Sequence, residues 1–126
     1  MDERSAYITL DGERFELLLT TRATREIAKR YGGLENLGEK LMKAENFEMA
    51  LDEIICLIVL LANQPILVHN LKHPEEKREL LTPEYVELLT SPFDLAEYKD
   101  AIMTAMIRGT QREIQSEDDG KNPKAG

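Results

Sequence analysis

Two histidines are the residues whose types and spacing come closest to a chemical site. His69 and His73 are four positions apart, so a helix would place both on one face, as a pair of metal ligands requires. Glu76 could supply a third ligand, but the chain contains no further histidine, and Pro74 follows His73 at once. Two polar histidines near the end of a helix are the simpler interpretation. We therefore expect no metal site and no cofactor.

No other pattern in the chain predicts catalysis. Carboxylates are numerous, yet none is flanked by residues that would tune an acid–base pair. The sequence contains no glycine-rich phosphate loop and no Gly-x-Ser-x-Gly motif. Cys56 is the only cysteine, and its place inside an apolar run predicts a small buried side chain. We expect a protein that is not an enzyme and has no small-molecule substrate.

Composition sets the broad class. A chain of 126 residues forms one domain with a single core. It carries 24 acidic and 16 basic side chains, and its net charge of −8 would repel phosphate backbones and anionic lipid. The N-terminus lacks the basic and then apolar segments of an export signal. We predict a cytoplasmic protein that binds neither nucleic acid nor membrane.

An apolar run from Ile54 to Ala62 predicts the helix around which the domain is built. Asn46 is a candidate N-cap, and acids fill the first turns. Pro65 has no N–H and disfavours a helical residue before it, so we expect the helix to stop near Gln64. A helix that is apolar on every side should be covered on every side. Core packing is the simpler role for it, and an apolar groove for a partner is the alternative.

The dipeptide Asp11-Gly12 lies between two β-prone runs and predicts a β-hairpin over about residues 6–20. Alternation along the second arm places Phe15, Leu17 and Leu19 on one face. Two strands alone are marginal in water. This face must therefore pack on the protein's own helices or on another subunit, which makes it a candidate interface.

A short helix over residues 22–31 should follow, with a threonine cap before it and Gly32-Gly33 after it. One face carries several cations, which could bind an acidic partner, although an ordinary solvated surface is the simpler interpretation. The inward stripe is Ala23, Ile27 and Tyr31, and the cations are Arg22, Arg25 and Lys29.

Three more helices are expected: residues 34–43, 83–89 and 92 to about 112. The last 12 residues show no apolar periodicity and predict a disordered acidic tail over 115–126. The predicted fold is mainly α: one domain over residues 1–114, with an N-terminal β-hairpin packed on a small helical domain with a central apolar helix. The inner face of the last helix should carry Leu95, Tyr98, Ile102, Met106 and Gly109.

Residues 24–32 also look like the first helix and turn of a helix-turn-helix. The next helix would then read DNA and would need basic or amide side chains facing the groove. It offers Glu35, Asn36, Glu39 and Lys40, interrupted by Gly38. The acids and the net charge argue against a DNA-binding regulator.

The order of elements resembles the tail assembly chaperones of long-tailed phages and prophages, especially those of Gram-positive hosts. The resemblance covers residues 6 to about 112 and is carried by the segment around Asp11-Gly12, the helix ending at Gly32-Gly33, the next short segment and the apolar helix. It implies a helical, non-enzymatic protein of the host cytoplasm that self-associates, coats the tape measure protein and helps bring tail tube subunits to it. An oligomeric interaction adaptor of another complex is the alternative.

Members of that family usually exist as a short form and a longer form made by a programmed ribosomal frameshift. The tripeptide Gly120, Lys121 and Asn122 can be encoded as GGA AAA AAC, which contains the heptamer A AAA AAC. Both ribosome-bound tRNAs can slip back one base on this heptamer and still pair. These three residues are therefore the candidate frameshift position.

Overall fold

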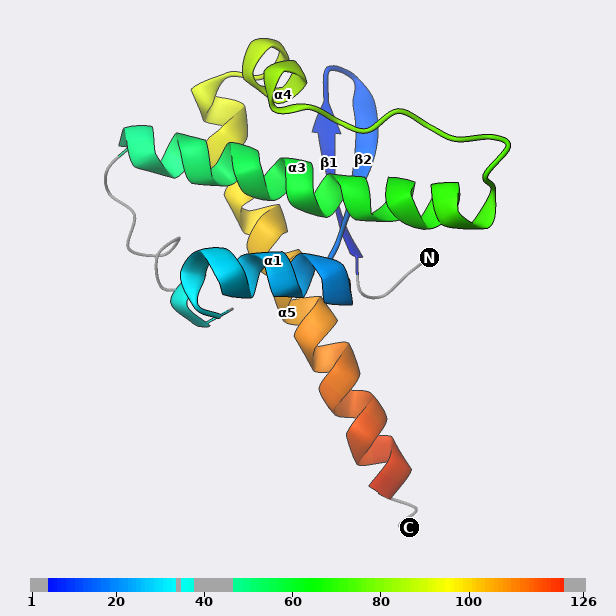
Figure 1. Ribbon diagram of the computed structural model, residues 1–126. Helices are drawn as coiled ribbons and strands as arrows, with labels where there is room; N and C mark the ends of the chain where they lie inside the picture. The colour runs from blue at the N-terminus through cyan, green and yellow to red at the C-terminus, as the bar shows by residue number, and fades with distance from the viewer. Residues whose placement is uncertain (1–4, 34, 38–46, 122–126) are drawn as a thin grey trace.

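The computed structural model describes residues 5–33, 35–37 and 47–121, with the side chains of 47–50 and 111–121 excepted. The mainly α fold with an N-terminal β-hairpin is confirmed, and α3 and α5 cross while the hairpin lies against both (Figure 1). The elements are β1 (Ser5–Leu10), β2 (Glu13–Leu18), α1 (Thr21–Tyr31), α3 (Phe47–Lys72), α4 (Pro83–Leu89) and α5 (Pro92–Lys121).

The hairpin forms as predicted, with Asp11-Gly12 as its turn. Asp11 has φ 53° and Gly12 has φ 77°, the positive values that a type I′ turn requires. The antiparallel register pairs Ala6 with Leu17 and Ile8 with Phe15, so these four side chains share one face. That face is apolar and packs inward.

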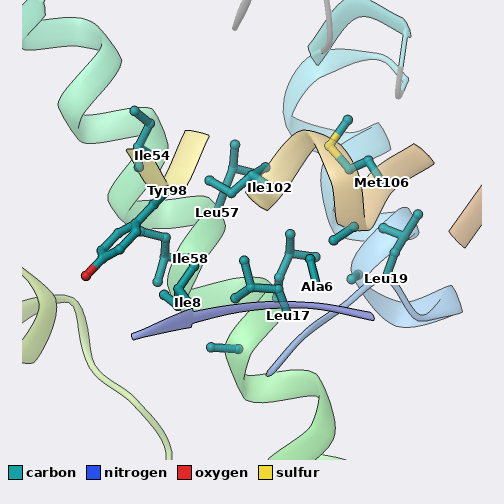
Figure 2. Packing of buried hydrophobic residues seen from close by; sticks show 14 of the residues in the cluster. Ala6, Ile8, Leu17, Leu19, Ile54, Leu57, Ile58, Tyr98, Ile102 and Met106 are labelled. Atoms are coloured by element: carbon teal, nitrogen blue, oxygen red, sulfur yellow. The ribbon is translucent and has the colours of Figure 1, made fainter. Parts of the chain in front are cut away.

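The core forms where the hairpin meets α3 and α5. Figure 2 shows Leu17 beside Ile58 of α3 and Ile102 of α5, and all three are fully buried. Leu19 lies against the backbone of Gly109, where an added Cβ would come within 2.9 Å of the leucine side chain. The hairpin is thus covered by the protein's own helices.

Of the two expected alternatives for this face, packing on the protein's own helices is the one observed, so its buried residues leave the candidate interface. Leu17 and Leu19 are buried in the core and do not form a surface of the folded chain. Phe15 is half-buried, and its ring meets that of Tyr85 edge to face with a centroid separation of 6.5 Å.

The short helix α1 has the predicted caps and inward stripe. The Thr20 hydroxyl accepts a hydrogen bond from the backbone N–H of Ala23 at 3.1 Å. Gly32 takes the left-handed conformation at φ 87°, and its N–H donates to the Ala28 carbonyl at 2.8 Å. The stripe faces the core: Ala23 and Ile27 are buried and Tyr31 is half-buried.

The predicted end of the central helix is wrong, because α3 continues through Pro65 to Lys72. A proline inside a helix removes one backbone hydrogen bond and costs about 3 kcal/mol. Side chains on both sides of it compensate: Gln64 donates to the Leu60 carbonyl at 2.9 Å, and Asn70 binds the loop after the helix. Tertiary contacts therefore outweigh the local penalty.

Two further expectations about α3 are also wrong. Cys56 is exposed rather than buried. Within the part of the chain that the structure describes, α3 is not covered on every side, because Val68 and Leu71 face solvent. The helix has a core-facing side and an open apolar side.

Helix α5 begins where predicted. The Ser91 hydroxyl accepts from the Asp94 N–H while the Asp94 carboxylate accepts from the Ser91 N–H, a reciprocal cap. Its inner face is confirmed: Leu95, Tyr98, Ile102 and Met106 are buried, and Gly109 contacts Leu19.

The predicted end of α5 near Arg112, and the predicted disorder from Gln115, are wrong for the residues up to Lys121, because the helix continues to that point. Missing apolar periodicity means that a segment has no buried face, and it does not prevent a helix rich in Gln, Glu and Arg. Residues 122–126 of the predicted tail, and most of the helix predicted over 34–43, lie outside the described residues.

Candidate functional site

The predicted histidine pair ties down a loop. The rings of His69 and His73 lie close together, with centroids 4.9 Å apart and planes tilted by 33°. His69 Nε2 hydrogen-bonds to the backbone carbonyl oxygen of Glu76 at 2.9 Å. Among the residues that the structure describes, no three His, Cys, Asp or Glu side chains are placed to hold a metal ion.

Two asparagines of α3 hold the same loop, residues 73–82, along the helix (Figure 1). The Asn70 carboxamide donates to the Arg78 carbonyl at 3.1 Å and accepts from the Arg78 N–H at 2.8 Å. Two helical turns earlier, Asn63 makes the same pair of bonds with Leu81, at 2.9 and 2.7 Å, in a buried setting. Each side chain pairs with the loop as a neighbouring strand would, so the loop is fixed against α3.

The fixed loop forms one wall of an open groove of about 520 Å³, which we call the α3 groove. Its floor is apolar, and Leu71 on that floor is 82% exposed. At one end the Thr20 hydroxyl donates to the side-chain oxygen of Gln64 at 2.5 Å and joins the start of α1 to α3. The groove is lined by Thr20, Arg22, Gln64, Leu67, Val68, Asn70, Leu71, Pro74 and Lys77.

The charged residues that line the α3 groove are both cations. Arg22 comes from α1 and Lys77 from the loop, and neither makes an ion pair with another residue of the described part of the chain. On a chain of net charge −8, two cations beside an apolar floor favour an acidic ligand.

The cations predicted on one face of α1 are solvent-exposed, and one of them lines the α3 groove. Arg22 lines the groove, whereas Arg25 and Lys29 lie further along the exposed side of α1. Lys29 makes a surface ion pair with Glu26 at 3.9 Å. A contact of this kind contributes little to stability.

Sequence reasoning missed most of the groove for one reason. Leu67, Val68 and Leu71 follow the predicted helix end at Gln64, so the prediction puts no helical face there. Lys77 lies in a run of mixed charge that resembles any solvated loop. One signal in the sequence is the pair Asn63 and Asn70. These two amides are seven residues apart, so a helix places their hydrogen-bonding groups on the same side.

A second apolar surface lies where α4 leads into α5, and we call it the corner patch. It consists of Leu88, Leu89 and Phe93. Leu88 is 72% exposed and Phe93 is 73% exposed, although both flank well-capped helix ends. Large apolar side chains that are exposed on either side of one short connection make this corner a candidate site of interaction.

One segment of α3, Leu51–Lys72, is long and apolar enough to cross a membrane, judged by length and composition alone. The core helix of a water-soluble domain meets the same criterion. Here Asn63 and Gln64 are buried in the middle of that segment and hydrogen-bond to the loop and to α1. These contacts suit a helix that packs inside a domain.

Two other predicted sites fall partly outside the described residues. Glu35 and Asn36 of the DNA-reading helix are exposed, and Asn36 donates to the Tyr31 carbonyl at 2.9 Å. Gly120 and Lys121 are the last residues of α5, while Asn122 is not described. Neither DNA binding nor the frameshift is tested by these positions.

No family model, no curated protein and no solved structure matches the chain.

Proposed function

We propose that this chain is a non-enzymatic assembly chaperone of the kind that serves long phage tails. In this proposal it covers apolar helical segments of the tape measure protein in the host cytoplasm and helps bring tail tube subunits to it. Copies of the chain associate with one another along the tape measure protein. The proposal is supported by the element order that the sequence shares with that family and by one structural observation.

That observation is the exposure of large apolar side chains on a domain whose core is otherwise closed. Leu71, Leu88 and Phe93 are each more than 70% exposed, while core residues such as Ile58 are fully buried. Exposing such side chains is unfavourable by about 1.5–3 kcal/mol each relative to burial. A partner that covers them is therefore favoured.

The shape and the charge of these surfaces favour a helical partner. An amphipathic helix lays its apolar face on an apolar surface of this kind. The corner patch lies on a short helix and the following helix start, so it presents side chains without an exposed strand edge. The net charge of −8 keeps the chaperone soluble while it carries an apolar client.

Co-purification tests the proposal. The tagged chain is produced together with the very long coiled-coil protein that we expect to be encoded immediately downstream of its gene, and capture is measured. The double variant Leu88→Asp with Phe93→Asp should reduce capture by about tenfold or more, because central apolar residues carry most of the binding energy.

A charge-matched control separates the corner patch from net charge. Thr21→Asp with Ala28→Asp adds the same two acids at exposed positions of α1, and it should capture the client as well as the natural chain does. Capture of the coiled-coil protein by neither the natural chain nor the control would refute the proposal. Capture of a different complex would identify the adaptor alternative.

A further inference from the structure

The C-terminal part of α5 extends away from the rest of the molecule (Figure 1). Among the side chains that the structure describes, Arg108 of α5 donates to the Ser5 carbonyl at 2.7 Å, and Gly109 lies against Leu19. The helix then continues over residues 111–121, which we call the α5 arm. Eleven residues at 1.5 Å each give an arm about 16 Å long.

The charges of the α5 arm oppose its own helix. Its acids are Glu113, Glu117, Asp118 and Asp119, against two cations, Arg112 and Lys121. The C-terminal end of a helix carries partial negative charge and is stabilised by cations, so three acids in the last turns are unfavourable there. Gly120 lowers the helix propensity further. A cationic surface against this end would offset both effects.

The α3 groove has the complementary pattern. The arm has one apolar residue, Ile114, among its acids, and the groove has an apolar floor beside Arg22 and Lys77. We infer that the α3 groove of one copy binds the α5 arm of a second copy. Ile114 would cover Leu71, and the acids would meet the two cations.

The contact must join two copies. The arm is continuous with a helix that leads away from the domain, so it cannot turn back into its own groove without breaking the helix (Figure 1). An arm in a neighbour's groove joins two different surfaces, so repeated contacts give rings or open chains of copies, and a mutual exchange of arms gives a dimer. Chains of this kind fit the self-association in the proposed function, although the contact needs no client protein.

The interface is small and rich in charge, which sets its expected behaviour. Contacts of this size bind weakly and transiently. Because exposed charges are screened by salt, self-association should weaken by about tenfold between about 50 mM and 500 mM salt. Sedimentation velocity over a concentration series measures both properties.

Charge reversal with complementation tests the inference. One variant carries Arg22→Glu with Lys77→Glu in the groove, and the other carries Glu117→Lys with Asp118→Lys in the arm. Each variant alone should be monomeric, because groove and arm then have the same sign. An equimolar mixture should associate again, since each arm meets a groove of opposite sign.

Each matched control has the same net charge as the variant that it accompanies. Arg25→Glu with Lys29→Glu reverses two exposed cations of α1 that do not line the groove, and Glu87→Lys with Asp100→Lys reverses two exposed acids outside the arm. Both controls should self-associate as the natural chain does. Far-ultraviolet circular dichroism should show unchanged helix content for the groove variant and both controls, because their positions are exposed. The arm variant should have unchanged or higher helix content, because cations suit the C-terminal end of a helix.

Three outcomes would overturn the inference: a natural chain that is monomeric at all concentrations, association that survives both reversals, or a mixture that stays monomeric. The chain alone is used throughout, so such a result leaves client capture by the corner patch unaffected. Conversely, loss of client capture with intact self-association would refute only the proposed function.

Discussion

At the scale of single residues, Tyr98 joins the two ends of the fold. Its hydroxyl donates to the Thr9 carbonyl at 2.5 Å, which links α5 to β1. Burial raises the pKa of Tyr98 above its ordinary 10.0, and the nearby charges of Asp94 and Glu97 raise it further. The neutral phenol is thus the form that the folded state prefers.

The raised pKa gives a signed prediction for stability. Because the folded pKa lies above the unfolded one, the contribution of Tyr98 is fully present below pH 10 and is lost as the pH rises through the folded value. Replacing Tyr98 with Phe should cost about 0.5–1.5 kcal/mol at pH 7 through the lost hydrogen bond. Denaturant unfolding at pH 7 and in strong alkali should show that this difference in the free energy of unfolding is smaller in alkali.

Replacing Tyr85 with Phe is the control, since its ring packs on Phe15 and it should keep the alkaline loss of the natural chain. A stability difference for Tyr98 that is the same at pH 7 and in strong alkali would contradict the assignment.

The paired asparagines give a second prediction at this scale. Replacing Asn63 with Ala leaves the Leu81 N–H and carbonyl buried without partners and should cost about 2–4 kcal/mol. Replacing Asn70 with Ala removes the same pair of bonds at an exposed position, where water can replace them, and should cost about 1 kcal/mol or less. Urea midpoints compare the two directly. Equal losses would show that the burial difference has no energetic role.

At the scale of elements, the close approach of α5 to the hairpin decides the effect of a glycine. Glycine to alanine in a helix normally stabilises by up to about 1 kcal/mol. At Gly109 the new Cβ would lie 2.9 Å from the Leu19 side chain, and overpacking of this kind costs about 1–3 kcal/mol. We expect Gly109→Ala to lower the thermal midpoint.

Gly120→Ala in the same helix serves as the matched control. It lies near the C-terminal end of α5, and the higher helix propensity of alanine should raise the helix content or leave it the same. A higher thermal midpoint for Gly109→Ala would mean that α5 is free to move away from Leu19.

Local signals predicted the elements whose ends are set by local chemistry. The Asp11-Gly12 turn, the Thr20 cap and the Ser91 cap each need only neighbouring residues, and each is present. The end of α3 could not be predicted in this way, because contacts 18 residues away in sequence, between Asn63 and Leu81, hold the chain that follows Pro65.

The candidate site depended on the same non-local contacts. Of the residues predicted to form an interface, Arg22 lines the groove, whereas Leu17 is core. Alternation identified an apolar face of the hairpin, but it could not show that α3 and α5 would cover that face. One side of α3 is open because the loop packs along the other side, and this packing depends on contacts with the distant residues Arg78 and Leu81.

At the scale of the whole molecule, the C-terminus bears on how a longer form would be made. The helix α5 reaches Lys121, so an added domain would follow directly from a helix end rather than from a flexible tether. We predict that codons 120–122 contain the heptamer A AAA AAC and that the −1 frame continues for the length of a small domain. The nucleotide sequence decides this. Codons that break the heptamer, or an immediate stop in the −1 frame, would exclude a frameshift here and leave the chaperone proposal open.

The central claim is that this chain keeps an apolar helical client soluble. The most direct measurement is the soluble fraction of the tape measure protein when it is produced with the chain, without it, and with the Leu88→Asp, Phe93→Asp variant. We expect the client to be mostly soluble with the natural chain and mostly aggregated in the other two cases, because aggregation follows from uncovered apolar surface. A client whose soluble fraction is the same in all three cases would contradict the claim.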